Sequence, residues 1–270
     1  MIKKAIIGLG IIVTLFSTVS CKFQKLLKSG DTPKKYEMAV KYFEGEDYYR
    51  SLQLLEELVG FYRGTANAEK TYYYYAYCHY YQRDFLLANF HFKNFVTTFP
   101  NSKFAEECSY MAAYCLYLDS PDFYLDQTNS ISAIKELQIF VNTYPKSQHV
   151  AECNDLIDKL RFKLEQKDFE IAKLYLKTEN YKAAVTAFKN VIKEYPSSQF
   201  KEEVYYGIIA AYYYYATKSI PSKKIERFQS SVDAYNVYRV IYPKGKFTKD
   251  AESLFKSASK ELNKVKNKNI

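Results

Sequence analysis

The sequence of 270 residues has no tryptophan, only 8 glycines and only 3 histidines. Because tight hairpin turns and phosphate-binding loops depend on glycine, this scarcity argues against hairpin-rich β folds and nucleotide-binding loops. His79, His91 and His149 are scattered, and none of them belongs to an HExxH zinc motif. A GxSxG nucleophile motif is absent as well. We therefore expect no enzymatic activity, no metal site, no cofactor and no small-molecule substrate.

The cysteines beyond residue 21 do not suggest a metal site either. Cys108 and Cys115 would share one face of a helix, but two turns separate them by about 10.5 Å, too far to bind the same ion. Together with Cys78 and Cys153 they are expected to be small buried side chains. An oxidising compartment would permit a disulfide, but no pair is favoured by the sequence.

Aromatic residues and basic charge are abundant. The chain has 29 tyrosines and 19 phenylalanines, and its formal net charge is +9. This charge is compatible with anionic lipid, an acidic partner or nucleic acid. Because the basic residues are spread among acidic ones, we do not expect nucleic-acid binding.

Residues 1–20 have the organisation of a secretory signal peptide. Lys3 and Lys4 are followed by an apolar run from Ala5 to Phe16 and then by small residues. The run is too short and wrongly flanked for a stable membrane span.

The signal peptide ends beside Cys21 in a pattern that resembles a bacterial lipobox, although Thr18 occupies a position where an aliphatic residue is usual. The resemblance implies that Cys21 is acylated and becomes the N-terminus; the alternative is a plain signal peptide with a chance cysteine. Residues 21–33 would then be the lipidated cysteine and a short basic linker. Lys22 is not the aspartate that would retain a lipoprotein at the inner membrane, so we expect the periplasmic face of the outer membrane.

One motif recurs four times, as FPNSKFAEE at 99–107, YPKSQHVAE at 144–152, YPSSQFKEE at 195–203 and YPKGKFTKD at 242–250. Proline ends a helix because its ring clashes with the preceding turn and its nitrogen carries no proton. Serine can cap the helix that follows, and the acidic residues complement its N-terminal dipole. Each motif therefore predicts the end of one helix and the start of the next.

The clearest unit between such junctions is DFEIAKLYLKTENYKAAVTAFKNVIKEYP, residues 168–196. Apolar residues recur at helical spacing on both sides of the polar KTEN stretch, which predicts two antiparallel helices. Ala172 and Ala184 would lie where the helices cross, since short side chains let helix axes approach to about 8 Å. Tyr175, Tyr181 and Phe188 would fill the space around that contact.

This arrangement resembles the tetratricopeptide repeat, and the frame can be laid along the chain five times. Aromatic residues would open the second helices at Tyr48, Phe85, Tyr181 and Phe228. The spacing requires three insertions: a loop at 118–130, extra helix within 147–177, and the stretch 216–224.

The predicted fold is all-α: a right-handed superhelix of about five tetratricopeptide-like hairpins. Repeats 1–3 would occupy residues 34–145, and repeats 4–5 with a C-terminal capping helix would occupy residues 146–270. The capping helix is predicted at 248–268, where apolar side chains fall on one side of the helix and lysines on the other.

Degenerate hairpins behind a lipobox, over this length, resemble the BamD family of outer-membrane β-barrel assembly lipoproteins. The resemblance implies a scaffold without catalytic activity. Its expected partners are the BamA-like barrel-forming subunit, held by the C-terminal repeats, and C-terminal segments of unfolded outer-membrane proteins, received by the N-terminal repeats. The alternative is another tetratricopeptide lipoprotein of the cell envelope, serving as an adaptor in cell division or at peptidoglycan.

Two sets of site residues follow. The tyrosines of TYYYYAYCHYYQ exceed what one helix face can bury, so Tyr73, Tyr74, Tyr77 and Tyr80 are candidates for peptide binding; packing between repeats is the alternative. A basic cluster near the junction of repeats four and five and the last helix is a candidate for contact with an acidic partner surface, and a solvated face is the alternative. This cluster consists of Lys218, Lys223, Lys224 and Arg227.

Overall fold

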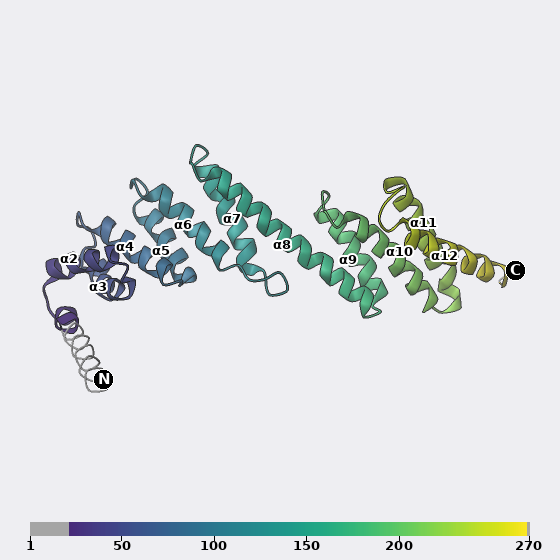
Figure 1. Cartoon of the computed structure of the whole chain (residues 1–270), viewed down its shortest axis with the longest axis horizontal. Coiled ribbons are helices and arrows are strands. Elements are labelled where there is room, and N and C mark those ends of the chain that lie inside the picture. The colour runs from purple at the N-terminus through teal and green to yellow at the C-terminus, as the bar shows by residue number, and fades with distance from the viewer. Residues whose placement is uncertain (1–21, 269–270) are drawn as a thin grey trace, which may run out of the picture. The chain divides into compact units, whose positions relative to one another are not determined.

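The computed structural model describes residues 22–268, which contain helices and no strand (Figure 1). Residues 22–27 are helical and precede the labelled helices. The labelled helices are α2 (Thr32–Glu44), α3 (Tyr48–Phe61), α4 (Ala68–Tyr81), α5 (Phe85–Thr98), α6 (Ala105–Leu118), α7 (Thr128–Thr143), α8 (Val150–Lys177), α9 (Tyr181–Glu194), α10 (Lys201–Thr217), α11 (Pro221–Ile241) and α12 (Thr248–Lys268). Five hairpins, α2/α3 to α10/α11, are followed by α12, as predicted.

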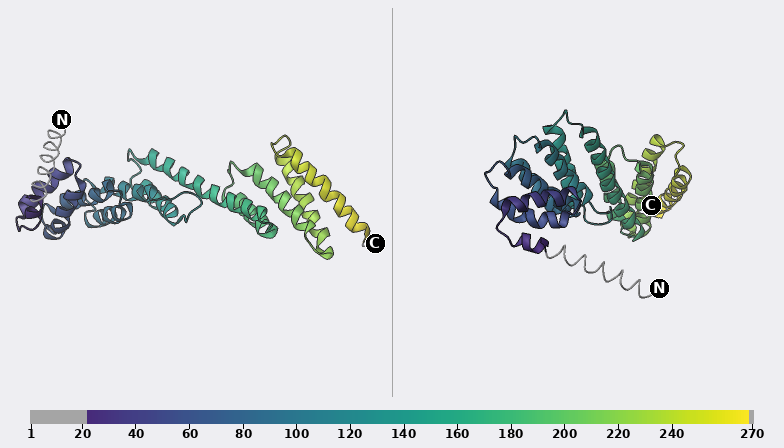
Figure 2. Two further views of the ribbon diagram at one scale, coloured as in Figure 1. Left: turned by 60° about the horizontal axis from the view of Figure 1, so that its bottom comes forward. Right: turned by 60° about the vertical axis from the view of Figure 1, so that its left-hand side comes forward.

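Residue contacts divide the chain into two compact units, and the division falls inside the long helix α8. Unit 1 runs to Pro121 and continues from Asp126 to Leu160, and unit 2 contains Asp122–Leu125 and the chain from Arg161 onward. In unit 2, α10 packs against both α9 and α11, and α12 packs against α11 (Figure 2, green to yellow). Each unit therefore has its own core.

The turns within three hairpins have the same geometry. Glu46, Arg83 and Glu179 adopt positive φ angles of 61°, 63° and 61°. In each turn this residue donates its N–H to the carbonyl three positions earlier, and the following residue donates to the carbonyl five positions earlier. This pattern is the Schellman ending of a helix, which satisfies carbonyl groups that the helix itself leaves unpaired.

Small residues lie where the paired helices cross, as predicted. Ala172 and Ala184 are fully buried, together with Phe188, in the core of unit 2. In the first hairpin Ser51 takes the place of alanine, and its hydroxyl donates to the carbonyl of Ala39 at 2.9 Å. The short side chains therefore bring the backbones close enough for a direct hydrogen bond between helices.

The four junction motifs form one repeated structure. The residue before each proline donates its N–H to the carbonyl four residues earlier, which completes the preceding helix. Its own carbonyl accepts the N–H of Ser102, Ser147, Ser198 or Gly245, and that residue's carbonyl accepts the first N–H of the next helix. The three serine hydroxyls each accept the N–H two residues later, at 2.9 to 3.2 Å. The motif therefore ends one helix and starts the next.

The fourth junction has Gly245 instead of serine, and a carboxylate supplies the missing acceptor. Glu202 of α10 accepts the N–H of Phe247 at 3.0 Å, the same N–H that serine binds in the other motifs. Its oxygen also accepts the hydroxyl of Tyr238 at 2.8 Å. A Cβ atom on Gly245 would lie 2.2 Å from this oxygen, so only glycine leaves room for Glu202.

The structure differs from the sequence prediction in the last hairpin and near the N-terminus. The second helix of hairpin five begins at Pro221 and not at Phe228, and residues 216–224 are not an insertion, because only residues 218–220 separate α10 from α11. Phe228 is buried inside α11. Within the predicted linker, Phe23 is buried and packs edge-on against Tyr42 at 5.7 Å. The continuous helix α8, the loop before α7 and the C-terminal helix α12 agree with the prediction.

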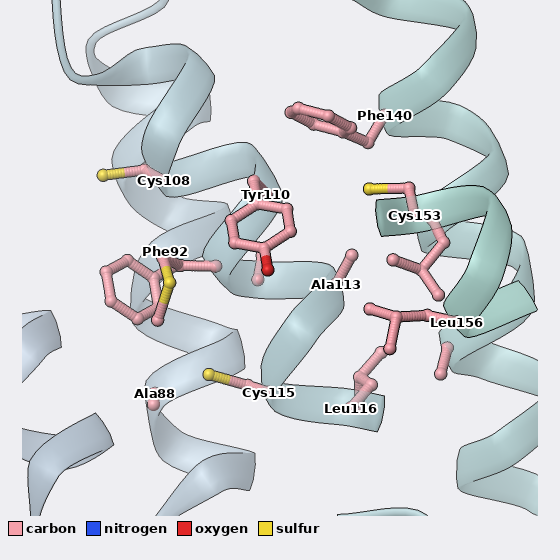
Figure 3. Close-up of a cluster of buried hydrophobic side chains, with 14 of the residues drawn as sticks. Ala88, Phe92, Cys108, Tyr110, Ala113, Cys115, Leu116, Phe140, Cys153 and Leu156 are labelled. Carbon is pink, nitrogen blue, oxygen red and sulfur yellow. The ribbon is translucent and has the colours of Figure 1, made fainter. Parts of the chain in front are cut away.

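The core of unit 1 contains the buried cysteines that the sequence predicted (Figure 3). Cys108 and Cys115 of α6 and Cys153 of α8 lie among apolar side chains, and all three thiols are free. Burial raises the pKa of Cys115 to about 12, so this thiol stays protonated and unreactive at neutral pH.

Gly245 provides a test of the junction. Gly245→Ala is expected to lower the free energy of unfolding by about 1 to 3 kcal/mol, because the new methyl group must displace the Glu202 carboxylate. Gly60 is exposed in α3 with nothing near its Cβ position. The control Gly60→Ala is therefore expected to raise the free energy of unfolding by about 0.5 to 1 kcal/mol. Urea denaturation of both variants measures the difference, and equal stability of the two would contradict this account of the junction.

Candidate peptide and partner interfaces

Helix α4 carries the four tyrosines predicted to bind peptide, and the structure divides them between two sides of the helix. Tyr73, Tyr77 and Tyr80 pack in the cluster that includes α6. Tyr74 faces α2 instead, with its ring 4.7 Å from that of Phe43. Tyr77 is buried, and the other three are partly buried. The structure therefore brings three of the four residues together.

Glu107 of α6 organises this group of tyrosines. Its carboxylate accepts the Tyr73 hydroxyl at 2.9 Å and also the Tyr77 hydroxyl. Burial and then the hydrogen bond to Glu107 raise the pKa of both phenols, so both remain protonated donors over the whole physiological range. The two rings lie 4.7 Å apart and are fixed between α4 and α6.

A cavity of about 480 Å³ adjoins Tyr77 on this side of unit 1. The ring of Tyr110 forms part of its lining and stacks on His149 at 4.0 Å and 14°. Tyr114 continues the stack along α6, with its ring 5.5 Å from that of Tyr110. The remaining lining residues are Lys103, Glu106, Glu107, Met111 and Gln148. Rings, carboxylates and an amide together can accept a peptide side chain and its backbone polar groups.

Sequence reasoning missed Tyr110, Glu107 and His149 as members of this site. Glu107 and His149 belong to the junction motifs, which were interpreted only as the end of one helix and the start of the next. Both side chains also contact the first helix of the preceding repeat. Glu107 accepts the Tyr73 and Tyr77 hydroxyls of α4, and His149 stacks on Tyr110 of α6.

Two histidines, His79 of α4 and His91 of α5, lie against each other and are held neutral. His79 and His91 stack with their ring centroids 4.9 Å apart. Burial lowers the pKa of His91 to about 4, helped by the neighbouring His79. Burial also lowers the pKa of His79. Residues 22–268 contain no group of three or more His, Cys, Asp or Glu side chains placed to hold a metal ion.

The four predicted partner-binding cations surround the turn at 218–220 in unit 2. Lys218 is exposed and pairs with Glu179 at 3.3 Å, and Lys223 pairs with Glu226 within α11, also at 3.3 Å. Arg227 lies over the ring of Tyr215, 3.7 Å from its centroid, and donates to Ser219. Lys224 is partly buried. Two of these charges are thus already neutralised by exposed ion pairs, which contribute little to stability.

The predicted anchor, Cys21, lies outside the described residues. Among the helices that the structure does describe, none combines the length and apolar character needed to cross a bilayer.

Comparison with known proteins adds a family to this fold. A family model described as YfiO, outer membrane lipoprotein, matches residues 29–226. The outer membrane protein assembly factor BamD of Caulobacter vibrioides is 26% identical over 136 residues, covering 50% of this chain and 45% of that protein. BamD of Rickettsia prowazekii is 24% identical over 107 residues, covering 37% of this chain and 43% of that protein. The chain thus matches less than half the length of these two relatives.

Among solved structures, a TPR repeats protein from Bacteroides fragilis resembles the chain with a TM-score of 0.40 and 13% identity, covering 85% of this chain and 99% of that one. The family model is the stronger finding because it spans most of the chain. The chain therefore belongs to the YfiO family of outer membrane lipoproteins, which confirms the BamD family predicted from its sequence.

Proposed function

We propose that this protein is a non-catalytic scaffold in the assembly of outer-membrane β-barrels, tethered through a lipid on Cys21 at the periplasmic face of the outer membrane. The observation that supports the proposal is the family match over residues 29–226, which includes the first four hairpins. Two relatives, 26% and 24% identical over the residues they match, carry the name outer membrane protein assembly factor.

In this proposal the two units have different partners. Unit 2 holds the periplasmic domains of a BamA-like barrel-forming subunit through the cations around residues 218–227. Unit 1 receives C-terminal segments of unfolded outer-membrane proteins at the tyrosine surface between α4 and α6. Tyrosine suits such a surface because its ring offers apolar contact while its hydroxyl remains compatible with water.

The partner interface can be tested by copurification. A tagged full chain in mild detergent is expected to bring down a barrel-forming subunit with repeated periplasmic domains. Reversal to glutamate at Lys218, Lys223 and Lys224 should reduce the recovered subunit severalfold, because an acidic partner surface would be repelled. Arg227→Gln, tested separately, should also lower recovery.

The matched control reverses Lys244, Lys249 and Lys260, which are exposed and form no ion pair within the described residues. This control changes the net charge equally and should leave recovery unchanged. Equal recovery with both triple variants would contradict the proposed interface. Recovery of peptidoglycan-associated or cell-division proteins alone would instead favour an envelope adaptor.

The tyrosine surface can be tested with a fluorescein-labelled nonapeptide that ends in phenylalanine. Tyr80→Ser is expected to raise the Kd about fivefold, since ring contacts contribute roughly 1 kcal/mol. Tyr74→Ser is the control, because Tyr74 is also partly buried on α4 but faces α2. Circular dichroism confirms that both variants fold. A stronger effect of Tyr74→Ser than of Tyr80→Ser would show that the peptide binds elsewhere.

The anchor can be tested by growth with radioactive palmitate. The wild-type chain should incorporate the label and Cys21→Ala should not, because the cysteine sulfur is the proposed acyl acceptor. A single acyl chain binds a bilayer only marginally, so a stable anchor needs several. Undiminished labelling of the Cys21→Ala variant would refute lipidation at this position.

A further inference from the structure

The exposed face of α9 in unit 2 carries a surface that sequence reasoning did not identify. Three neighbouring cavities of about 450, 330 and 390 Å³ open along this helix. The first two share Lys182, Thr186 and Asn190, and the second and third share Lys189 and Tyr212. Adjacent cavities share lining residues, and the three together are here called the α9 groove.

Helices α10 and α11 complete the α9 groove beyond Lys189. The third cavity includes Tyr205 and Ile208 of α10 together with Ala234 and Val237 of α11. Helix α10 packs against both α9 and α11. This end of the groove is therefore apolar and formed by three helices of one unit.

Two lysines provide the charge of the α9 groove. Lys182 and Lys189 are exposed, and neither forms an ion pair with a carboxylate of residues 22–268. The Lys189 ammonium donates to the Tyr212 hydroxyl at 2.9 Å and lies 5.3 Å from the centroid of that ring. Asp233 is the carboxylate among the lining residues, and it accepts a hydrogen bond from Gln229 at 3.0 Å. Two cations against one carboxylate favour an anionic occupant.

Polar side chains beside the two lysines can form hydrogen bonds with a peptide backbone. Thr186 and Asn190 are exposed in the same cavities. Thr186 donates its hydroxyl to the carbonyl of Lys182 at 3.2 Å, which leaves its oxygen free to accept a peptide N–H. Asn190 can both donate and accept. From Asn180 to Ile192 the helix rises about 18 Å, which matches roughly five residues of extended chain.

The α11 wall leaves apolar area uncovered. Val237 is 50% exposed, and the nearby Val240 is 82% exposed. An apolar side chain of the occupant would cover Val237 in the cavity that Ile208 also lines. Exposed apolar side chains beside two lysines are expected of a surface that binds an acidic peptide with interspersed apolar residues.

We propose that the α9 groove binds an extended acidic peptide segment of a partner protein, with carboxylates at Lys182 and Lys189 and an apolar side chain over Val237. This site goes beyond the proposed function, since it contains none of the four cations at residues 218–227. Anionic lipid could also meet the two lysines, but a headgroup would leave Asn190, Thr186 and the apolar end of the groove without a role.

The test measures fluorescence anisotropy of a labelled heptapeptide that alternates glutamate with leucine, titrated with the full chain in mild detergent. The variant Lys182→Glu/Lys189→Glu is expected to weaken binding at least tenfold. The matched control Lys249→Glu/Lys260→Glu changes the net charge equally on α12 and should stay within twofold of wild type. Val237→Asp should weaken binding without altering either lysine.

Four results would overturn the proposal. Unchanged binding to the Lys182/Lys189 variant would remove the groove as the site. An equal loss in the α12 control would attribute the effect to bulk charge. Equal binding of a peptide with glutamine in place of glutamate would attribute it to apolar contact. The fourth result combines two measurements: the wild-type chain binds phosphatidylglycerol vesicles but no peptide, and the Lys182/Lys189 variant loses vesicle binding. This result would identify a membrane contact instead. The copurification experiment above is independent of all four results.

Discussion

The junction between successive hairpins is the constraint on which the rest of the structure depends. At each of the four motifs, one residue before proline and one small residue three positions later connect two helices through backbone hydrogen bonds. These bonds satisfy groups that helix ends otherwise leave unpaired. Because the polar groups of the helix ends are satisfied locally, the helices can associate mainly through their apolar faces. At the fourth motif Gly245 has no hydroxyl, and the Glu202 carboxylate accepts the N–H of Phe247 in its place. The same N–H position therefore has an acceptor at all four motifs.

Local rules made the hairpins predictable from sequence. Proline stops, alanines at helix crossings and aromatic residues such as Tyr181 at helix starts act within a few residues of one another, so single-sequence reasoning reaches them. The errors arose where one signal has two meanings. Pro221 was assigned to an insertion, whereas proline is also favoured in the first turn of a helix, and α11 begins there. Phe23 was assigned to a linker because nothing local indicates that Tyr42 covers it.

The sites could not be predicted in the same way, because they depend on neighbours distant in sequence. Helical periodicity spaces Tyr73, Tyr74 and Tyr77 around α4, but it does not reveal that Glu107, thirty residues beyond Tyr77, selects two of them. The α9 groove posed the same problem. Lys182 and Lys189 look like ordinary solvated residues until α10 and α11 place Tyr212 and Val237 near them. The sequence pattern predicts which residues share a face of a helix, but only the packed structure shows which residues that face contacts.

The contacts proposed for the two units differ in physical basis. Around α4 and α6 the donors are phenols whose raised pKa keeps them neutral. Hydrogen bonds and ring contacts of this kind respond weakly to ionic strength. The contacts proposed for unit 2 depend on exposed lysines, whose attraction for an acidic partner salt would screen over about 8 Å at physiological ionic strength. Ionic strength would therefore weaken association through unit 2 while leaving association through unit 1 nearly unchanged. A scaffold with these two surfaces would bind one partner through charge and another through hydrogen bonds and ring contacts. Ionic strength would then change one contact without changing the other.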